Sequence, residues 1–187
     1  MVGADLLRPS LKRHAVAYDA ALILAGSLFI ALCAQIVIPL PFSPVPVTGQ
    51  TLAVLLVGAA LGSRRGVFAV LAYLAEGAAG WPVFAGGGAG PVRLLGPSGG
   101  YLLGFVLAAW FAGSLAERGW DRRIGTTVLL MVLGSLAIYA VALPWLATFV
   151  GWQRVLALGL YPFIAGDLAK VLCAALLLPS AWKLLRV

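Results

Sequence analysis

An acid and a base lie three residues apart in the stretch IAGDLAKVL, whose other residues are all apolar or small. At this i,i+3 spacing, Asp167 and Lys170 share one face of a helix, where their charges can neutralise each other. Charged residues inside a bilayer are costly, so they usually face the interior of a helix bundle and have partners there. Two roles fit such a pair: locking helices together, or binding a ligand. Because apolar packing can often replace a purely structural pair without loss of stability, we favour ligand binding.

Further polar residues are expected in the same half of the membrane as this pair. Gln50 and Tyr101 begin apolar segments, Glu76 ends one, and Arg93 lies in a glycine-rich loop above them. Polar groups that converge on an apolar, aromatic pocket are typical of a small-molecule site. A lone loop arginine equally suits contact with solvent or with a lipid headgroup. The residues that we predict to bind a ligand are Asp167, Lys170, Gln50, Tyr101 and Arg93.

No catalytic arrangement fits these residues. The stretch GPSG contains the GxSG pattern of rhomboid intramembrane proteases, but its serine needs an activating base. The only histidine, His14, is expected on the opposite side of the membrane from Ser98. An aspartyl protease needs two carboxylates that share a proton, whereas Asp19 and Asp167 are expected near opposite membrane surfaces. None of the three lysines follows a glycine, as the phosphate-binding P-loop requires. The sequence therefore predicts neither an enzyme nor an ATPase of the P-loop kind.

The composition predicts an integral membrane protein. Hydrophobic residues make up 63% of the 187 residues and charged residues only 10%, with a mean hydropathy of +1.05, which is outside the range of soluble globular domains. No charged side chain occurs between Ala20 and Ser63. The two cysteines, Cys33 and Cys173, lie in apolar segments and define neither a disulfide framework nor a metal site.

Six apolar segments predict an all-α protein with six transmembrane helices in a single domain over residues 1–187, after a cytoplasmic N-terminal segment over residues 1–19. The second and third segments would be only ~20 Å and ~22 Å long as helices, less than the ~30 Å hydrocarbon core. They must tilt, extend into loops or lie partly buried in protein. The segments are Ala20–Pro39, Gln50–Gly62, Gly66–Gly80, Gly100–Ala116, Ile124–Ala147 and Pro162–Trp182.

The distribution of Lys and Arg predicts that both termini are cytoplasmic, because cytoplasmic loops are enriched in these residues. Ten of the thirteen bases fall on one side of the predicted spans, two on the other, and Lys170 lies within a span. The formal net charge of +7 therefore reflects topology and not a nucleic-acid surface. The bases on the predicted cytoplasmic side are Arg8, Lys12, Arg13, Arg64, Arg65, Arg118, Arg122, Arg123, Lys183 and Arg186; those opposite are Arg93 and Arg154.

Two long loops on the predicted external side suggest a lid over a site. Pro39–Gln50 contains four prolines, which forbid a regular helix. Trp81–Gly99 is rich in glycine, and such a backbone at membrane depth is tolerated where it packs on protein or lines a cavity. The alternative is that both loops are simple connectors, which their many apolar residues disfavour.

Small residues every four positions mark one face of the first span as a surface for a partner helix. Ala17, Ala21 and Ala25 form one such series, and Ser27 and Ala31 form a second pair. Such small-xxx-small faces let helices approach closely. Ordinary packing within the chain explains the same pattern equally well.

Five motifs follow one another along the chain: VPVTGQT (Val45–Thr51), LGSRRG (Leu61–Gly66), GWPVFAGG (Gly80–Gly87), GPSGGYLLGF (Gly96–Phe105) and GDLAK (Gly166–Lys170). Together they resemble the BioY family, the biotin-specific substrate-binding (S) components of energy-coupling factor (ECF) transporters. The resemblance implies a six-helix S-component fold in the plasma membrane of a prokaryote, with biotin bound near the external face. It also implies a transmembrane coupling subunit and paired ABC-type ATPases as partners, docked on the small-residue face of the first helix.

Biotin suits the predicted site chemically. Asp167 can accept from a ureido N–H and Lys170 can donate to a ligand oxygen, each as a charge-assisted hydrogen bond. Arg93 is our candidate for the carboxylate of the tail, with Gln50 and Tyr101 as supporting contacts. Biotin is the transported ligand, and no cofactor is implied. Two alternatives remain at this stage: a self-sufficient, oligomeric carrier of biotin or another small anion, and a membrane scaffold without a ligand.

Overall fold

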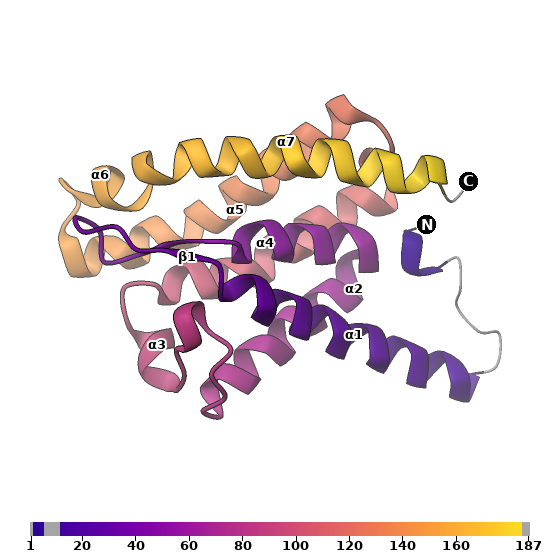
Figure 1. Ribbon diagram of the computed structural model, residues 1–187, viewed down its shortest axis with the longest axis horizontal. Coiled ribbons are helices and arrows are strands. Elements are labelled where there is room, and N and C mark those ends of the chain that lie inside the picture. Colours follow the sequence, from indigo (N-terminus) through magenta and orange to yellow (C-terminus); the bar gives the residue numbers. More distant parts are fainter. Residues whose placement is uncertain (1, 6–11, 185–187) are drawn as a thin grey trace.

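The computed structural model describes residues 2–5 and 12–184. Long helices run side by side, and short elements cap the end of the bundle opposite both termini (Figure 1). By length and composition, five helical segments of the described chain are able to cross a membrane. The elements are η1 (Gly3–Asp5), α1 (Lys12–Ala34), β1 (Val37–Ile38), β2 (Val47–Thr48), α2 (Gln50–Ala78), η2 (Ala85–Gly87), α3 (Pro91–Leu95), α4 (Gly99–Glu117), η3 (Trp120–Arg122), α5 (Ile124–Val150), α6 (Val155–Gly159) and α7 (Tyr161–Leu184).

Helix α2 contains the second and third apolar segments as two arms. The helix is interrupted at Gly62, whose φ of 86° and ψ of 173° are not helical and whose positive φ favours glycine. The chain doubles back there, so that the two arms pack against each other. A Cβ atom on Gly66 in the second arm would lie only 2.9 Å from the Cα atom of Gly58 in the first. Glu117 of α4 accepts hydrogen bonds from the backbone N–H (2.7 Å) and the hydroxyl (2.8 Å) of Ser63. These bonds satisfy a donor at the start of the second arm.

The chain between α1 and α2 corrects the expectation of purely helical secondary structure. Helix α1 ends at Ala34, before the predicted end at Pro39, and strand β1 follows. Strands β1 and β2 pair antiparallel, with Val37 opposite Thr48 and Ile38 opposite Val47. The physical reason is that β-branched residues favour strands and that a proline disfavours helical backbone at the residue before it.

The beginning of α1 also differs from the prediction, because the helix starts at Lys12 and not at Ala20. Residues 12–19 are therefore helical and continuous with the first predicted span. The charged residues in this stretch did not prevent helix formation, since a helix can extend beyond the hydrocarbon core while its polar turns remain in the interface.

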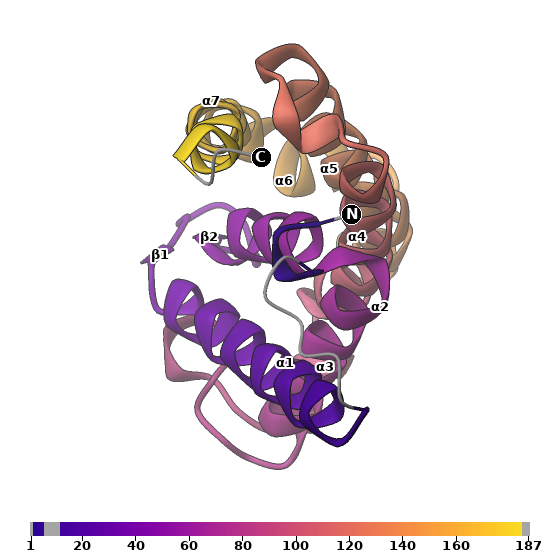
Figure 2. The same ribbon diagram turned by 90° about the vertical axis from the view of Figure 1, so that its right-hand side faces the viewer.

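The long helices follow an arc from α1 through α2 and α4 to α5 and α7 (Figure 2). Small residues permit close approach along this arc. A Cβ atom on Gly58 would lie 2.6 Å from the backbone oxygen of Ala109, and one on Gly104 would lie 2.8 Å from that of Ile138. Helix α2 is thus held against α4, and α4 against α5, by backbone contacts that larger side chains would block.

Helix α7 is fixed at its C-terminal end by the loop between α4 and α5. The indole N–H of Trp182 donates to the buried carboxylate of Asp121 over 2.6 Å, and the guanidinium of Arg122 lies 4.5 Å from the centre of a Trp182 ring. Burial raises the pKa of Asp121, and the Trp182 hydrogen bond offsets this only in part. These contacts orient the helix that carries Asp167 and Lys170.

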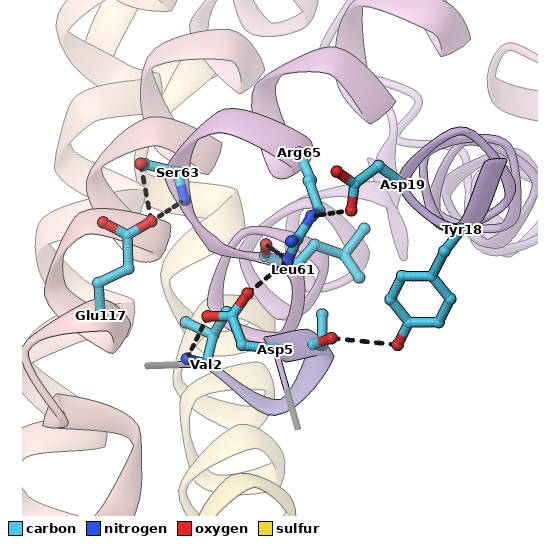
Figure 3. A network of polar contacts seen from close by, with 9 residues as sticks. Val2, Asp5, Tyr18, Asp19, Leu61, Ser63, Arg65 and Glu117 are labelled. Atoms are coloured by element: carbon cyan, nitrogen blue, oxygen red, sulfur yellow. Dashed lines mark hydrogen bonds and ion pairs between the residues drawn. The ribbon is translucent and has the colours of Figure 1, made fainter. Parts of the chain in front are cut away.

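At the same end of the bundle, a polar network joins the N-terminal residues to α1 and to the turn of α2 (Figure 3). Arg65 donates to Asp5 over 2.9 Å and to Asp19 over 2.8 Å. The hydroxyl of Tyr18 donates to the backbone oxygen of Ala4 over 3.1 Å. This network fastens the short turn η1 and the N-terminal half of α1 to α2.

Six of the bases predicted on the cytoplasmic side lie on loops or helix ends near this end: Arg64, Arg65, Arg118, Arg122, Arg123 and Lys183. The Gly62 turn is bonded to the end of α4, and the end of α7 to η3, so the loops that carry these bases are neighbours. Arg8 and Arg186 lie outside the described residues. Arg93 and Arg154 belong to the opposite end, on α3 and just before α6.

Candidate ligand-binding site

A cavity lies at the end of the bundle opposite the termini, and all five predicted ligand-binding residues line it. About 740 Å³ of space in and around its mouth is free of protein atoms, and part of this space is open solvent. Its floor and sides come from α2, α4, α5 and α7, and its upper wall from the two long loops. Of the loops, Pro39–Gln50 contributes Val45, Pro46 and Thr48, and Trp81–Gly99 contributes Phe84, Ala85, Arg93 and Ser98.

Asp167 and Lys170 face this cavity from α7. The Lys170 ammonium lies 3.3 Å from the Oδ1 atom of Asp167 and 2.7 Å from the Oγ1 atom of Thr51 on α2. Their side chains are only 17% and 15% exposed, and both line the cavity. Because the ammonium has three donors and two are used here, it retains one for a ligand.

Tyr139 and Thr51 are site residues that the sequence did not reveal. Tyr139 lies in the middle of α5, and its hydroxyl donates to the Oδ2 atom of Asp167 over 2.5 Å. Thr51 follows Gln50 in the first turn of α2 and accepts from Lys170. A tyrosine or threonine inside an apolar segment is too common a feature to mark a site. The only available signal was that a buried ion pair requires further hydrogen-bonding partners.

Tyr101 forms an aromatic wall of the cavity. Its hydroxyl donates to the backbone oxygen of Gly159 over 2.5 Å, so its only proton is already used. Its ring is tilted by 33° against Phe163 and stands edge-on to Tyr139, with ring centres 5.9 Å and 6.3 Å away. The geometry therefore favours a contact of the Tyr101 ring, and not of its hydroxyl, with a ligand.

Gln50 is engaged mainly with the protein. Its amide oxygen accepts from the hydroxyl of Thr48 over 3.0 Å, and its amide nitrogen donates to the hydroxyl of Tyr73. The side chain is buried, with 4% exposure. One amide N–H remains for a ligand, and the two bonds to the protein fasten the end of strand β2 to the second arm of α2.

Arg93 reaches the cavity from α3, a five-residue helix in the glycine-rich loop. Its Nε atom lies against the backbone at Gly88, where a Cβ atom would be only 2.8 Å away. Within the described part of the chain, its guanidinium makes no ion pair. Arg93 is therefore available to bind an anion from above.

Glu76 lies outside the cavity, unlike the other polar residues expected in this half of the bundle. Its carboxylate accepts a hydrogen bond from the buried hydroxyl of Ser27 over 2.6 Å. Ser27 and Ala31 thus face the interior. Ala17, Ala21 and Ala25 are exposed on the opposite side of α1. The two small-residue patterns of the first helix therefore differ in environment.

Both long loops are fastened to the bundle. The hydroxyl of Ser43 donates to the backbone oxygen of Leu158 in α6 over 2.7 Å. Phe84 is buried edge-on against Tyr73 and packs on Gly77, where a Cβ atom would overlap its ring. These contacts make the loops ordered walls of the cavity.

The charged side chains that line the cavity suit an anionic ligand with both donors and acceptors. Asp167 contributes one negative charge, and Lys170 and Arg93 contribute two positive charges. The rest of the lining is largely aromatic and aliphatic. Among the described residues, no group of three or more His, Cys, Asp or Glu side chains is placed to hold a metal ion.

A bundle of long apolar helices around such a cavity defines a polytopic membrane protein that binds a small ligand. The chain belongs to the BioY family, whose family model matches residues 8–187. A protein from Pyrococcus horikoshii named "Probable biotin transporter BioY" is 40% identical over 154 residues, covering 81% of this chain and 90% of that protein. "Biotin transporter BioY" of Thermotoga maritima is 39% identical over 145 residues, covering 75% and 82%.

A solved structure has the same fold. It is described as the crystal structure of the S-component for biotin from an ECF-type ABC transporter, and it matches with a TM-score of 0.81 over 93% of this chain and 95% of that chain. The sequence identity is 23%, so this likeness concerns the fold. The family and the named relatives are transporters and not enzymes, and no cofactor is indicated.

Proposed function

We propose that this chain takes up biotin by binding it in the cavity between α2, α4, α5 and α7. The observation that carries the proposal is that Asp167, Lys170 and Arg93 line one cavity although they come from two distant parts of the chain. An ion pair kept only to lock helices would not need to face an open space. The names of the relatives support biotin as the ligand.

Each part of biotin has a counterpart in the cavity. The ureido ring offers two N–H donors and a carbonyl acceptor, which suit the carboxylate of Asp167 and the remaining donor of Lys170. The apolar thiophane ring suits the aromatic wall formed by Tyr101 and Phe163. Arg93 provides the positive charge that the carboxylate of the tail requires.

We place the cavity at the external face of a prokaryotic plasma membrane, with both termini in the cytoplasm. The positive-inside rule supports this orientation, because the loops at the end bearing the termini carry most of the bases. In this topology each arm of α2 is a separate crossing, which gives six transmembrane helices in one domain.

The proposal includes partners that supply the energy for transport. The chain lacks a P-loop, so ATP would be hydrolysed by paired ABC-type ATPases and the energy transmitted by a transmembrane coupling subunit. The solved structure with the same fold is described as part of such a transporter. The exposed face of α1 that carries Ala17, Ala21 and Ala25 is our candidate for the docking surface.

Calorimetric titration of the detergent-solubilised chain with biotin, desthiobiotin and lipoate tests the ligand. We expect saturable binding that prefers biotin, and absence of biotin binding would refute the proposed function. Uptake by proteoliposomes that contain this chain alone tests the need for partners. Accumulation of biotin there would support a self-sufficient carrier and not an S component.

A further inference from the structure

We propose that Tyr139 is a positioning residue that makes the site select a neutral N–H donor over a cationic one. Tyr139 acts through Asp167, whose carboxylate it binds from α5. The inference rests on the proposed function, because the neutral donor in question is the ureido ring of biotin.

The carboxylate of Asp167 is held from two sides. Its Oδ2 atom accepts from Tyr139 over 2.5 Å, and its Oδ1 atom lies 3.3 Å from the ammonium of Lys170. The two donors come from different helices, α5 and α7, so the plane of the carboxylate is fixed relative to the cavity. The lone pairs left over by these bonds define where a ligand N–H can be accepted.

The same two bonds also reduce the negative charge that a ligand meets at Asp167. Hydrogen bonds to an ionised carboxylate are charge-assisted. Each donor places a partial positive charge beside the carboxylate and so offsets part of its negative charge. With the ammonium of Lys170 3.3 Å away and Arg93 also lining the cavity, a further cation at this position would be repelled. A neutral ureido N–H gains a hydrogen bond without that repulsion.

Tyr139 is well placed to hold this arrangement. Its ring stands edge-on to Tyr101, with ring centres 6.3 Å apart and an angle of 83° between the planes. Tyr101 is in turn bonded to the backbone oxygen of Gly159. The hydroxyl of Tyr139 is thus aimed at Asp167 by packing that does not involve the ligand.

The test compares biotin with 2-iminobiotin, in which a guanidinium-like group replaces the ureido group and carries a positive charge at neutral pH. Both ligands are titrated at the same pH into the full-length wild-type chain and into Tyr139→Phe. Loss of the hydroxyl should lower biotin affinity about tenfold. It should lower iminobiotin affinity much less or raise it, so that the preference for biotin over iminobiotin falls severalfold or more.

Tyr161→Phe is the matched control, because Tyr161 lies on α7 but is exposed and does not line the cavity. This variant should prefer biotin over 2-iminobiotin as strongly as the wild type does. Tyr139→Met removes the same hydroxyl and serves as the second variant if Tyr139→Phe does not fold. An equal fall in affinity for both ligands would overturn the inference, since loosened packing affects them alike. Absence of biotin binding by the wild type would instead refute the proposed function.

Discussion

Lys170 lies closer to Thr51 than to Asp167: its ammonium is 2.7 Å from the Thr51 hydroxyl oxygen on α2 and 3.3 Å from the carboxylate on its own helix. The two charges are therefore held slightly apart by neutral hydroxyl groups, Thr51 on one side and Tyr139 on the other. A pair held in this way can exchange part of its mutual attraction for bonds to a ligand. Thr51 should accordingly contribute to affinity although it carries no charge.

Thr51→Val is expected to lower biotin affinity about fivefold, ~1 kcal/mol. Valine has the shape of threonine without the hydroxyl, so Lys170 loses its neutral acceptor and moves toward Asp167. Thr51→Ser keeps the hydroxyl and should bind biotin nearly as the wild type does. Calorimetric titration of the three proteins measures the effect, and equal affinities in all three would show that the Thr51 bond does not matter for binding.

Asp167→Asn is expected to lower biotin affinity at least tenfold, ~1.4 kcal/mol or more. The substitution preserves shape but leaves the partly buried ammonium of Lys170 without its counter-charge, so thermal stability in detergent should fall as well. Lys170→Met should weaken binding likewise.

The double variant Asp167→Asn with Lys170→Met separates the two effects. Removing the lone charge should restore much of the melting temperature, while biotin binding should stay weak. Recovery of binding together with stability would indicate that the pair is only structural.

The parts of this molecule that could be predicted from sequence are those where the bilayer restricts the choice of residue. A charged pair in an apolar segment is costly enough to mark Asp167 and Lys170, and the loops that contain Pro39 and Arg93 are too rich in proline and glycine to be lipid-facing helices. Asp167, Lys170 and Arg93, which these two features point to, all line the cavity.

The parts that could not be predicted depend on which side chains meet in the folded chain. Tyr139 is an ordinary residue in an apolar helix until α7 brings Asp167 within reach. Gln50 was expected as a supporting contact to the ligand, yet most of its hydrogen-bonding capacity is used by Thr48 and Tyr73. The strand pair β1–β2 was missed because two-residue strands give no periodic signal.

Arg93 is expected to bind the carboxylate of biotin, which predicts an effect that depends on the ligand. Arg93→Gln should lower biotin affinity about tenfold but change the affinity for biotinamide, which lacks the negative charge, by less than about threefold. Arg154→Gln is the matched control, because Arg154 belongs to the same end of the bundle and does not line the cavity. Calorimetry with both ligands measures this, and an equal loss for both would assign Arg93 to the structure of the loop.

The bond between Asp5 and Arg65 predicts a pH dependence of stability. Burial alone would raise the pKa of Asp5, but the hydrogen bond and charge of Arg65, together with the Val2 N–H, outweigh it and lower the pKa below the ordinary value of 3.8. A carboxylate with a lowered folded-state pKa stabilises the folded chain fully above its unfolded-state pKa, and this contribution is lost as the pH falls through the folded-state value.

At pH 7, Asp5→Asn should therefore melt at a lower temperature than the wild type. The difference in melting temperature should shrink as the pH is lowered from about 5 toward about 3, because the ordinary pKa of an aspartate, ~3.9, lies within this range. Melting curves in detergent at several pH values measure this. Arg65→Gln should show the same convergence, whereas Arg64→Gln, at an exposed neighbour, should remain close to the wild type. A constant difference across the pH range would contradict the assignment to Asp5.

The exposed small residues of α1 predict a variant that separates binding from transport. Ala21→Leu adds bulk in the middle of the series Ala17, Ala21 and Ala25, which is exposed and distant from the cavity. Biotin affinity of the isolated chain should be unchanged, while copurification with a coupling subunit and biotin uptake by cells should fall severalfold, because close helix approach depends on small side chains.

Leu24→Ala, a substitution that removes bulk at an exposed position of the same helix, should leave copurification and uptake unchanged. If Ala21→Leu also leaves uptake unchanged, this face of α1 is not the docking surface, and the biotin site is unaffected by that result.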